Sequence, residues 1–265
     1  MPATPIASLR EFTEWVEARA VAAGQLWFRG TGRVNYELTP SLYRHPAITA
    51  VQELVELEGH IITRFRERSL PYLERHVVDD WDYLFLMQHY GAPTRLLDWS
   101  ENPYVGLFFA LTSAHRSAAN PNEYDFPAAV WVMQPVEWNK AALSHISYTG
   151  EVLSTTRDQL KGYATGGSFD MMNLYPVAMY GAHNSRRIVA QRGVFTIFGK
   201  NTTAMEAIYE QQAFPTESLH RLEIAAAVIP QLLESLLAIG FVDSVVYPDL
   251  DGLSREIKRH FKYRV

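Results

Sequence analysis

Residues 88–111, QHYGAPTRLLDWSENPYVGLFFAL, place reactive and charged side chains directly before the most apolar short run of the chain. Pro103 is expected to begin a buried helix, with Ser100 or Asn102 as its N-cap. The backbone N–H groups at a helix N-terminus point outward and favour a bound anion. The polar residues before this helix are therefore predicted to line an anion-binding cleft: Thr94, Arg95, Asp98, Ser100 and Glu101.

The same segment is also compatible with a structural role. Asp98 could pair with Arg95 to satisfy a buried turn, and His89, which precedes Tyr90 and a Gly-Ala-Pro break, could be a hydrogen-bonded core histidine. Structural ion pairs concentrate charge near helix ends just as binding sites do. Spacing alone leaves both interpretations open.

A second candidate residue, Arg29, stands in the segment LWFRGTG at residues 26–32. Residues 25–30 are predicted to form a strand, because the segment is rich in aromatic residues, and the strand ends in a flexible Gly-Thr-Gly turn. Trp27 and Phe28 beside it favour a partly buried guanidinium that needs an anionic partner. A solvated surface arginine is the alternative.

The common signatures of nucleotide, metal and hydrolase sites are absent from the sequence, including the P-loop, Gly-x-Gly-x-x-Gly, His-Glu-x-x-His and Gly-x-Ser-x-Gly. The absence of cysteine excludes disulfides, thiolate catalysis and Cys-ligated zinc. His89, Asp98, Asp249 and Asp251 could in principle ligate magnesium or manganese, but the Asp-Leu-Asp-Gly turn equally suits a helix cap. No dedicated metal site is predicted.

The composition is that of a globular protein. The 265 residues are 48% apolar and 20% charged, which is enough to bury one large core. The net charge of −5 gives no general attraction to nucleic acid or to an anionic membrane, although a local basic patch is compatible with it. The N-terminal MPATPIASLREFTEW has no charged region followed by an apolar run, so a cytoplasmic protein without a membrane partner is expected.

The hydrophobic pattern predicts an α+β fold, a mixed β-sheet core with flanking helices, because strands and helices do not alternate regularly. A first helix, capped by Ser8 and Glu11, is expected to end near residue 23. The other predicted helices are 51–65, 81–90, 103–114, 204–212, 230–240 and 250–261. The predicted strands are 25–30, 94–99, 129–134, 194–198, 222–229 and 242–247, and the irregular residues 145–185 are a candidate lid or target-binding loop. The whole chain, 1–265, is expected to form one domain, with a helical portion 1–24 and a core 25–262.

Four stretches together resemble the FRG-domain family: LWFRGTG at 26–32, HYGAPTRLLDWSENP at 89–103, QRGVFT at 191–196 and YPDLDGL at 247–253. The family is named for a Phe-Arg-Gly motif, which stands here as Phe28-Arg29-Gly30. The resemblance extends from about residue 25 to residue 260. Its central segment is long and unusual in composition, which makes it specific.

An arginine on an early strand, followed later by a Ser or Thr at the start of an apolar helix, is also similar in order to the ADP-ribosyltransferase superfamily. That resemblance implies an ADP-ribosyltransferase-like fold, with Arg29 holding the phosphates of NAD and Ser100 positioning the nicotinamide ribose. The superfamily usually supplies a glutamate from a later strand, but the corresponding segment AQRGVFT offers Gln191 and then Gly193. The carboxylate role would then pass to Glu101, Asp98 or Asp249, or catalysis would be lost.

The resemblance implies an enzyme that uses NAD as a substrate, cleaves the N-glycosidic bond to nicotinamide and transfers ADP-ribose to a macromolecular acceptor, protein or nucleic acid, in a toxin or phage-defence role. The expected catalytic residues are Arg29, Ser100, Glu101 and Gln191. The expected NAD-binding residues are Arg29, Gly30, Thr31, His89, Tyr90, Thr94, Arg95, Asp98 and Ser100. The alternatives are a nucleotide-binding sensor without turnover and a metal-dependent hydrolase that uses Asp98, Asp249 and Asp251.

Overall fold

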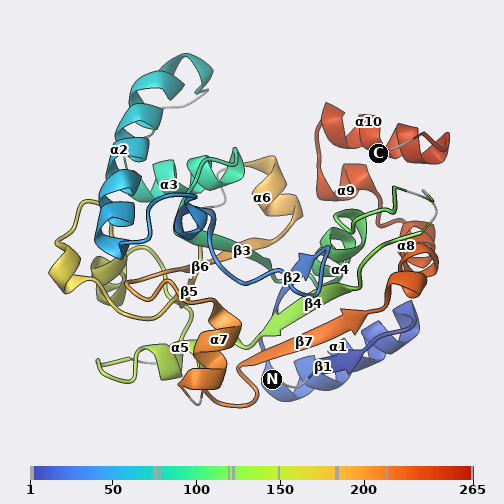
Figure 1. The fold of residues 1–265 in the computed structure, drawn as a ribbon, viewed down its shortest axis with the longest axis horizontal. Helices are drawn as coiled ribbons and strands as arrows, with labels where there is room; N and C mark the ends of the chain where they lie inside the picture. Colours follow the sequence, from blue (N-terminus) through green and yellow to red (C-terminus); the bar gives the residue numbers. More distant parts are fainter. Residues whose placement is uncertain are drawn as a thin grey trace.

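The computed structural model describes residues 3–73, 77, 79–118, 120, 123–148, 150–182, 185–212, 214–263 and 265. Its centre is a mixed sheet whose strands, among these residues, lie in the order β1-β7-β4-β2-β3-β6-β5. Only β1 and β7 pair in parallel, and the other neighbours are antiparallel. The predicted α+β class with a mixed sheet and flanking helices is confirmed (Figure 1).

The strands are β1 (Ala3–Pro5), β2 (Trp27–Thr31), β3 (Leu96–Ser100), β4 (Ala128–Met133), β5 (Val177–Met179), β6 (Gly193–Ile197) and β7 (Leu219–Ile224). The helices are α1 (Leu9–Ala23), α2 (Val51–Ser69), α3 (Asp80–His89), α4 (Pro103–Thr112), α5 (Pro135–Ala142), α6 (Arg186–Ala190), α7 (Met205–Gln211), α8 (Ile229–Ala238), α9 (Asp243–Val246) and α10 (Leu250–His260). Short 3-10 helices cover Ser41–Arg44, Leu70–Tyr72, Asp158–Tyr163, Phe169–Met171 and Ala226–Val228.

The buried hydrophobic residues form two clusters, which lie on opposite faces of β2 and β4. Successive side chains of a strand point to opposite faces, and Trp27 and Phe28 of β2 accordingly belong to different clusters. The cluster around Trp27 includes buried residues of α3, α5 and α7. The cluster around Phe28 includes residues of α1, α4 and α8. In β3 and β6, by contrast, successive residues such as Val194 and Phe195 both belong to the cluster around Trp27, which therefore covers both faces of that part of the sheet.

Several helix starts agree with the pattern in the sequence. The Ser8 side chain accepts a hydrogen bond from the Glu11 backbone N–H at 3.1 Å, as expected for a capping residue. Asn102, rather than Ser100, caps α4, and its side chain accepts from the Tyr104 N–H at 2.9 Å. The predicted start of α4 at Pro103 is confirmed, and it places an apolar helix against β2.

The packing of α4 on β2 depends on two glycines. A Cβ atom on Gly30 would lie 2.0 Å from the Gly106 carbonyl oxygen and 2.3 Å from the Ala110 backbone nitrogen. A Cβ atom on Gly106 would lie 2.7 Å from the Phe28 Cβ. Because backbone atoms cannot move aside as a flexible side chain can, both positions require glycine for this close approach.

The sheet opens between β2 and β3. All of β2, from Trp27 to Thr31, pairs with β4, whereas β2 and β3 share the single pair Phe28–Ser100. On its other side β3 pairs along its whole length with β6. The two central strands therefore separate beyond that pair, and we call this opening the seam.

Some element predictions are wrong. Residues 242–247, predicted as a strand, contain the short helix α9, so they do not join the sheet. Its Asp243 is buried and accepts from the Arg259 Nε of α10 at 2.6 Å, a contact that the Val-rich pattern does not reveal. The strand predicted at 222–229 ends at Ile224, and β1, β5 and α5 were not predicted.

No helix within the described ranges combines the length and the hydropathy required to span a bilayer. The irregular residues 145–182 contain two short 3-10 helices and β5.

Candidate functional site

A cavity of about 310 Å³ opens at the seam, where β2, β3 and β6 meet the ends of α3, α4 and α6. Six of the sequence-predicted site residues line it: Arg29, Gly30, His89, Asp98, Ser100 and Gln191. They come from widely separated parts of the chain. The sequence predicts one cleft lined by Arg29, His89, Arg95, Asp98, Ser100 and Gln191; five of these side chains line this cavity, and Arg95 does not.

Arg29 spans the seam. Its NH1 donates to the Asp98 carbonyl oxygen at 2.6 Å, so a side chain joins the two strands beyond their single backbone pair. Its Nε is buried and has no hydrogen-bond acceptor among the described residues. Burial lowers the pKa of the guanidinium below its usual value, the charge of Asp98 opposes this, and nearby Arg44 adds to it. The seam thus holds a cation whose hydrogen-bonding capacity is only partly used.

Asp98 is the acidic residue of the cavity lining. Its Oδ2 accepts from the Gln88 Nε2 of α3 at 2.6 Å, and the residue is exposed. The Gln88 Oε1 in turn accepts from the Thr94 hydroxyl, which fixes the orientation of the amide. The Asp98 carboxylate is therefore held in place at the mouth of the cavity.

His89 and Arg187 bring further polar groups to the lining. Burial and the charge of Arg187 lower the pKa of His89 below 6.5, against the opposing charges of Asp98 and Asp249. His89 is therefore neutral near pH 7. The Arg187 guanidinium lies 4.7 Å from the ring centroid of Tyr247, a cation–π contact that holds it beside the cavity.

Ser100 has a structural role in this arrangement. Its hydroxyl donates to the Gln191 carbonyl oxygen at 2.6 Å and accepts from the Asn102 backbone N–H at 2.9 Å. The residue is only 4% exposed. Ser100 therefore ties the end of β3 to the turn before β6, and its hydroxyl is occupied by protein partners.

The two other expected catalytic side chains also have protein partners. Gln191 lines the cavity, and its Nε2 donates to the Val246 carbonyl oxygen at 3.1 Å. Glu101 is not part of the cavity lining, and its Oε1 accepts from the Gln25 Nε2 at 2.8 Å. Asp98 is thus better placed than Glu101 to act as the carboxylate of this cavity.

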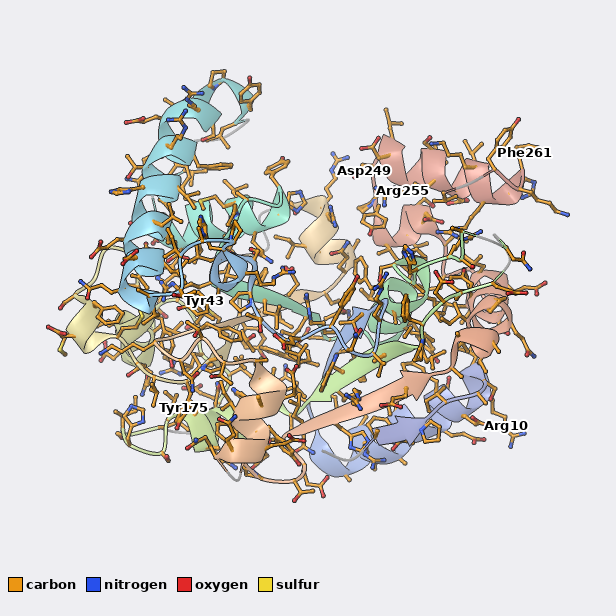
Figure 2. The ribbon with its side chains drawn as sticks, in the orientation of Figure 1. Arg10, Tyr43, Tyr175, Asp249, Arg255 and Phe261 are labelled. Carbon is orange, nitrogen blue, oxygen red and sulfur yellow. The ribbon has the colours of Figure 1, made fainter. Side chains whose placement is uncertain are left out.

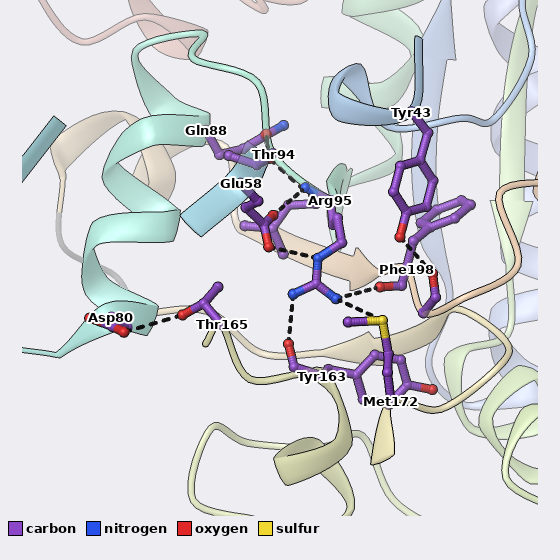
Figure 3. A network of polar contacts seen from close by, with 12 residues as sticks. Tyr43, Glu58, Asp80, Gln88, Thr94, Arg95, Tyr163, Thr165, Met172 and Phe198 are labelled. Atoms are coloured by element: carbon purple, nitrogen blue, oxygen red, sulfur yellow. Dashed lines mark hydrogen bonds and ion pairs between the residues drawn. The ribbon is translucent and has the colours of Figure 1, made fainter. Parts of the chain in front are cut away.

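Arg95 lies outside the cavity, contrary to expectation, and the predicted pair with Asp98 is not formed. The residue is completely buried, and its Nε donates to the Glu58 Oε2 of α2 at 2.7 Å. Its NH1 donates to the Phe198 carbonyl oxygen at 3.1 Å and its NH2 to that of Tyr163 at 2.8 Å (Figure 3). Arg95 therefore connects α2 and the start of β3 to the segment 145–182, which belongs to the candidate lid. The described residues of that segment do not line the cavity.

Thr94, Thr31 and Tyr90 also lie outside the cavity lining. Thr94 is fully buried beside Ser41 and Gln88. Thr31 is 7% exposed, with its hydroxyl 3.4 Å from the Ala129 carbonyl oxygen to which it donates. Tyr90 is 71% exposed and lines a separate groove. These three side chains are close to the cleft in the sequence but do not line the cavity.

The three aspartates of the hydrolase alternative are not brought together. Asp249 caps α10 by accepting from the Gly252 N–H at 2.8 Å, and it lies at the start of that helix, on the side of α6 (Figure 2). Asp251 is exposed in the first turn of that helix. In the described ranges of the chain, His, Asp and Glu side chains form no group of three or more that could hold a metal ion.

Sequence reasoning missed Arg187, Gln88 and the aromatic walls of the cavity. The walls are formed by Phe28, Phe85, Trp99, Phe109 and Phe195. Arg187 stands four residues before Gln191. Because residues four apart share a helix face, a predicted helix at 186–190 would have placed Arg187 beside Gln191. The Arg-Arg-Ile-Val-Ala segment is too short to give that signal.

The chain was compared with known proteins. No curated protein and no solved structure matches it. The FRG domain family model does match, over residues 24–119, which include β2, α2, α3, β3 and α4 and therefore Arg29, His89 and Asp98. Arg187 and Gln191 of the cavity lie beyond the matched residues. The resemblance carried by Phe28-Arg29-Gly30 and the HYGAPTRLLDWSENP segment is confirmed: the chain contains an FRG domain match at residues 24–119.

Proposed function

We propose that the cavity binds an NAD-like dinucleotide and that the protein is an ADP-ribosyltransferase-like enzyme. The proposal implies that its fold is related to the ADP-ribosyltransferase fold. The observation that carries the proposal is the seam arginine. Arg29 is fixed by one nitrogen, while its buried Nε lacks a protein acceptor within the described ranges. A buried donor without an acceptor is costly, so a phosphate oxygen that accepts from it would be strongly favoured.

The surrounding charges support an anionic ligand. Arg187 lines the same cavity, and Arg44 lies close enough to lower the pKa of Arg29 through its charge. The volume of about 310 Å³ is at the lower end of typical ligand pockets. The nicotinamide and its ribose would occupy the cavity, the pyrophosphate would lie by Arg29 and Arg187, and the adenosine would extend over the rim.

The side chains of the cavity suit cleavage of the N-glycosidic bond. The bond from the ribose C1′ to nicotinamide would break with its electron pair leaving on the nicotinamide nitrogen, and an acceptor atom would form the new bond to C1′. The Asp98 carboxylate would stabilise the positive charge that develops on the ribose. Neutral His89 is able to receive the proton of the acceptor. The aromatic walls would exclude water.

A nucleotide sensor without turnover is the second candidate. The hydroxyl of Ser100 is already engaged by Gln191 and Asn102. Gly193 stands where the superfamily resemblance expects a glutamate, and it supplies no side chain. Both observations favour binding over catalysis, so turnover depends on whether Asp98 can replace that glutamate.

Nicotinamide release from NAD, with and without EDTA, separates these functions. A transferase releases nicotinamide in the presence of EDTA, and Asp98→Asn should slow release about a hundredfold because one charge-stabilising group is lost. Asp158→Asn, at an exposed aspartate paired with Lys161, is the matched control and should leave the rate unchanged. Comparison with Glu101→Gln identifies which carboxylate acts.

Isothermal titration with NAD completes the test. Binding without nicotinamide release, even when candidate acceptors are added, assigns the sensor function. If the protein neither binds NAD nor releases nicotinamide, the proposal is wrong.

A further inference from the structure

A second concave surface lies beside the cavity, between the C-terminal half of α2, the 3-10 helix Leu70–Tyr72 and the end of α3. It has a volume of about 590 Å³. We call it the arginine–tyrosine groove and define it by Arg64, Phe65, Arg68, Tyr72, Leu73 and Tyr90.

The groove exposes large aromatic rings. Tyr72 is 85% exposed and Tyr90 is 71% exposed. The two residues lie on different elements, yet both line this one groove. Tyrosine rings of this kind offer flat apolar faces on which nucleobases stack, an interaction that every base can make because every base has a π-face.

The charged side chains that the structure describes in the groove lining are all positive. Arg64 and Arg68 are one helical turn apart and therefore share a face of α2. Both are exposed, and neither forms an ion pair with any described residue. Arg66, between them, pairs instead with Asp80. The described residues of the groove lining include no carboxylate, so these residues attract phosphates locally even though the whole chain has a net charge of −5.

We infer that the arginine–tyrosine groove binds single-stranded nucleic acid, with bases stacked on Tyr72 and Tyr90 and phosphates paired with Arg64 and Arg68. Exposed aromatic faces beside two guanidinium groups, with no carboxylate among the described lining residues, fit a strand of stacked bases and phosphates. A duplex hides its base faces and cannot use the tyrosines. This inference concerns binding alone and does not depend on the reaction proposed for the cavity.

The groove and the cavity are in contact through two neighbouring side chains. The rings of His89, which lines the cavity, and Tyr90, which lines the groove, meet edge to face with their centroids 4.7 Å apart. A strand in the groove therefore passes next to the mouth of the cavity.

Fluorescence anisotropy with a labelled single-stranded oligonucleotide of about 12 nucleotides, within the usual site sizes, tests the inference without NAD. Tyr72→Ala and Tyr90→Ala should each weaken binding by about fivefold or more, whereas Tyr72→Phe should retain affinity because the ring is kept. Arg64→Gln and Arg68→Gln should each lower the slope of log affinity against log salt by about 0.7.

Two matched controls report on specificity. Tyr263→Ala removes a ring that is 72% exposed at the C-terminal end, and Arg10→Gln removes an exposed arginine of α1, at the opposite edge of the molecule from α2 (Figure 2). Neither should alter the affinity. All changed side chains are exposed, so thermal melting should be unchanged.

The inference is overturned if the oligonucleotide does not bind, or if the control variants weaken binding as much as the groove variants do. It is also overturned if a duplex of the same sequence binds as tightly as the single strand. A peptide whose binding depends on Tyr90, in the absence of oligonucleotide binding, would assign the groove to a protein partner.

Discussion

Arg29 combines a structural contact with an unused donor. Its NH1 bridges to β3, while its Nε is buried without a described acceptor. Lysine lacks the planar fork that can hold the backbone and a phosphate together. We expect Arg29→Lys to weaken NAD binding by about 2 kcal/mol, roughly thirtyfold, with little change in the melting temperature. Titration calorimetry and thermal melting check this, and a large loss of stability with unchanged affinity would assign Arg29 a purely structural role.

The buried pair of Arg95 and Glu58 should behave differently, because it contributes to stability. Glu58 accepts from both the backbone N–H and the Nε of Arg95 at a site closed to solvent. Glu58→Gln leaves a buried cation without its counter-charge and should lower the free energy of unfolding by about 3 to 5 kcal/mol. Urea denaturation measures this. Asp80→Asn, which breaks the exposed pair with Arg66, should cost under about 1 kcal/mol.

His89 should make stability depend on pH. Its pKa is lowered in the folded protein by burial and by Arg187, so the unfolded chain binds the proton more tightly. The free energy of unfolding should therefore fall as the pH falls through about 6.5. His89→Gln should flatten part of this fall in urea titrations at several pH values. His220, whose pKa burial also lowers, accounts for a further part. An unchanged profile in His89→Gln would show that His89 is not responsible.

The sequence predicts the environment of the Arg29 side chain better than that of the Arg95 side chain. Aromatic neighbours and a glycine turn correctly indicate a partly buried Arg29. Arg95 stands in an equally polar segment, but it is buried because it pairs with Glu58, 37 residues away in the sequence. The sequence pattern places Glu58 on a charged helix face. Nothing in local spacing shows that this glutamate turns inward.

At the scale of elements, the contact of β2 with α4 should be sensitive to one methyl group. Gly30→Ala would place a Cβ atom 2.0 Å from the Gly106 carbonyl oxygen, so α4 would have to move away from the sheet. We expect a loss of about 3 kcal/mol of stability in urea denaturation. Gly59→Ala is the matched control, because its Cβ meets nothing within 4 Å in α2. That change should stabilise the protein by about 1 kcal/mol, and equal effects of the two changes would contradict this account.

Long helices with capping residues could be predicted from the sequence, whereas short strands could not. Ser8 and Pro103 mark the starts of α1 and α4 because caps and proline act locally. The strands β1 and β5 have three residues each, and their pairing with β7 and β6 depends on distant parts of the chain. The helix α9 has four residues, which is too few for a period to separate a helix from a strand.

At the scale of the whole molecule, two concave surfaces adjoin each other. The cavity at the seam and the arginine–tyrosine groove meet at His89 and Tyr90, at the end of α3. Local pattern predicts the α+β class and six of the cavity residues, because these six stand at or near the ends of predicted strands and helices. It does not predict the groove, because Tyr90 and Arg64 come together only through the packing of α2 against α3.

The seam also divides the sheet into two parts, β1-β7-β4-β2 and β3-β6-β5, joined by one backbone pair and by the Arg29 side chain. A phosphate that accepts from the buried Arg29 Nε, while NH1 still donates to the Asp98 carbonyl oxygen, would hold the two parts of the sheet together. A phosphate that draws the whole guanidinium away from the Asp98 carbonyl oxygen would break this side-chain link between the two parts. Hydrogen–deuterium exchange therefore distinguishes the two modes of binding. We expect NAD to slow exchange of the β2 and β3 amides, whereas faster exchange would show that the ligand gains its affinity by loosening the sheet.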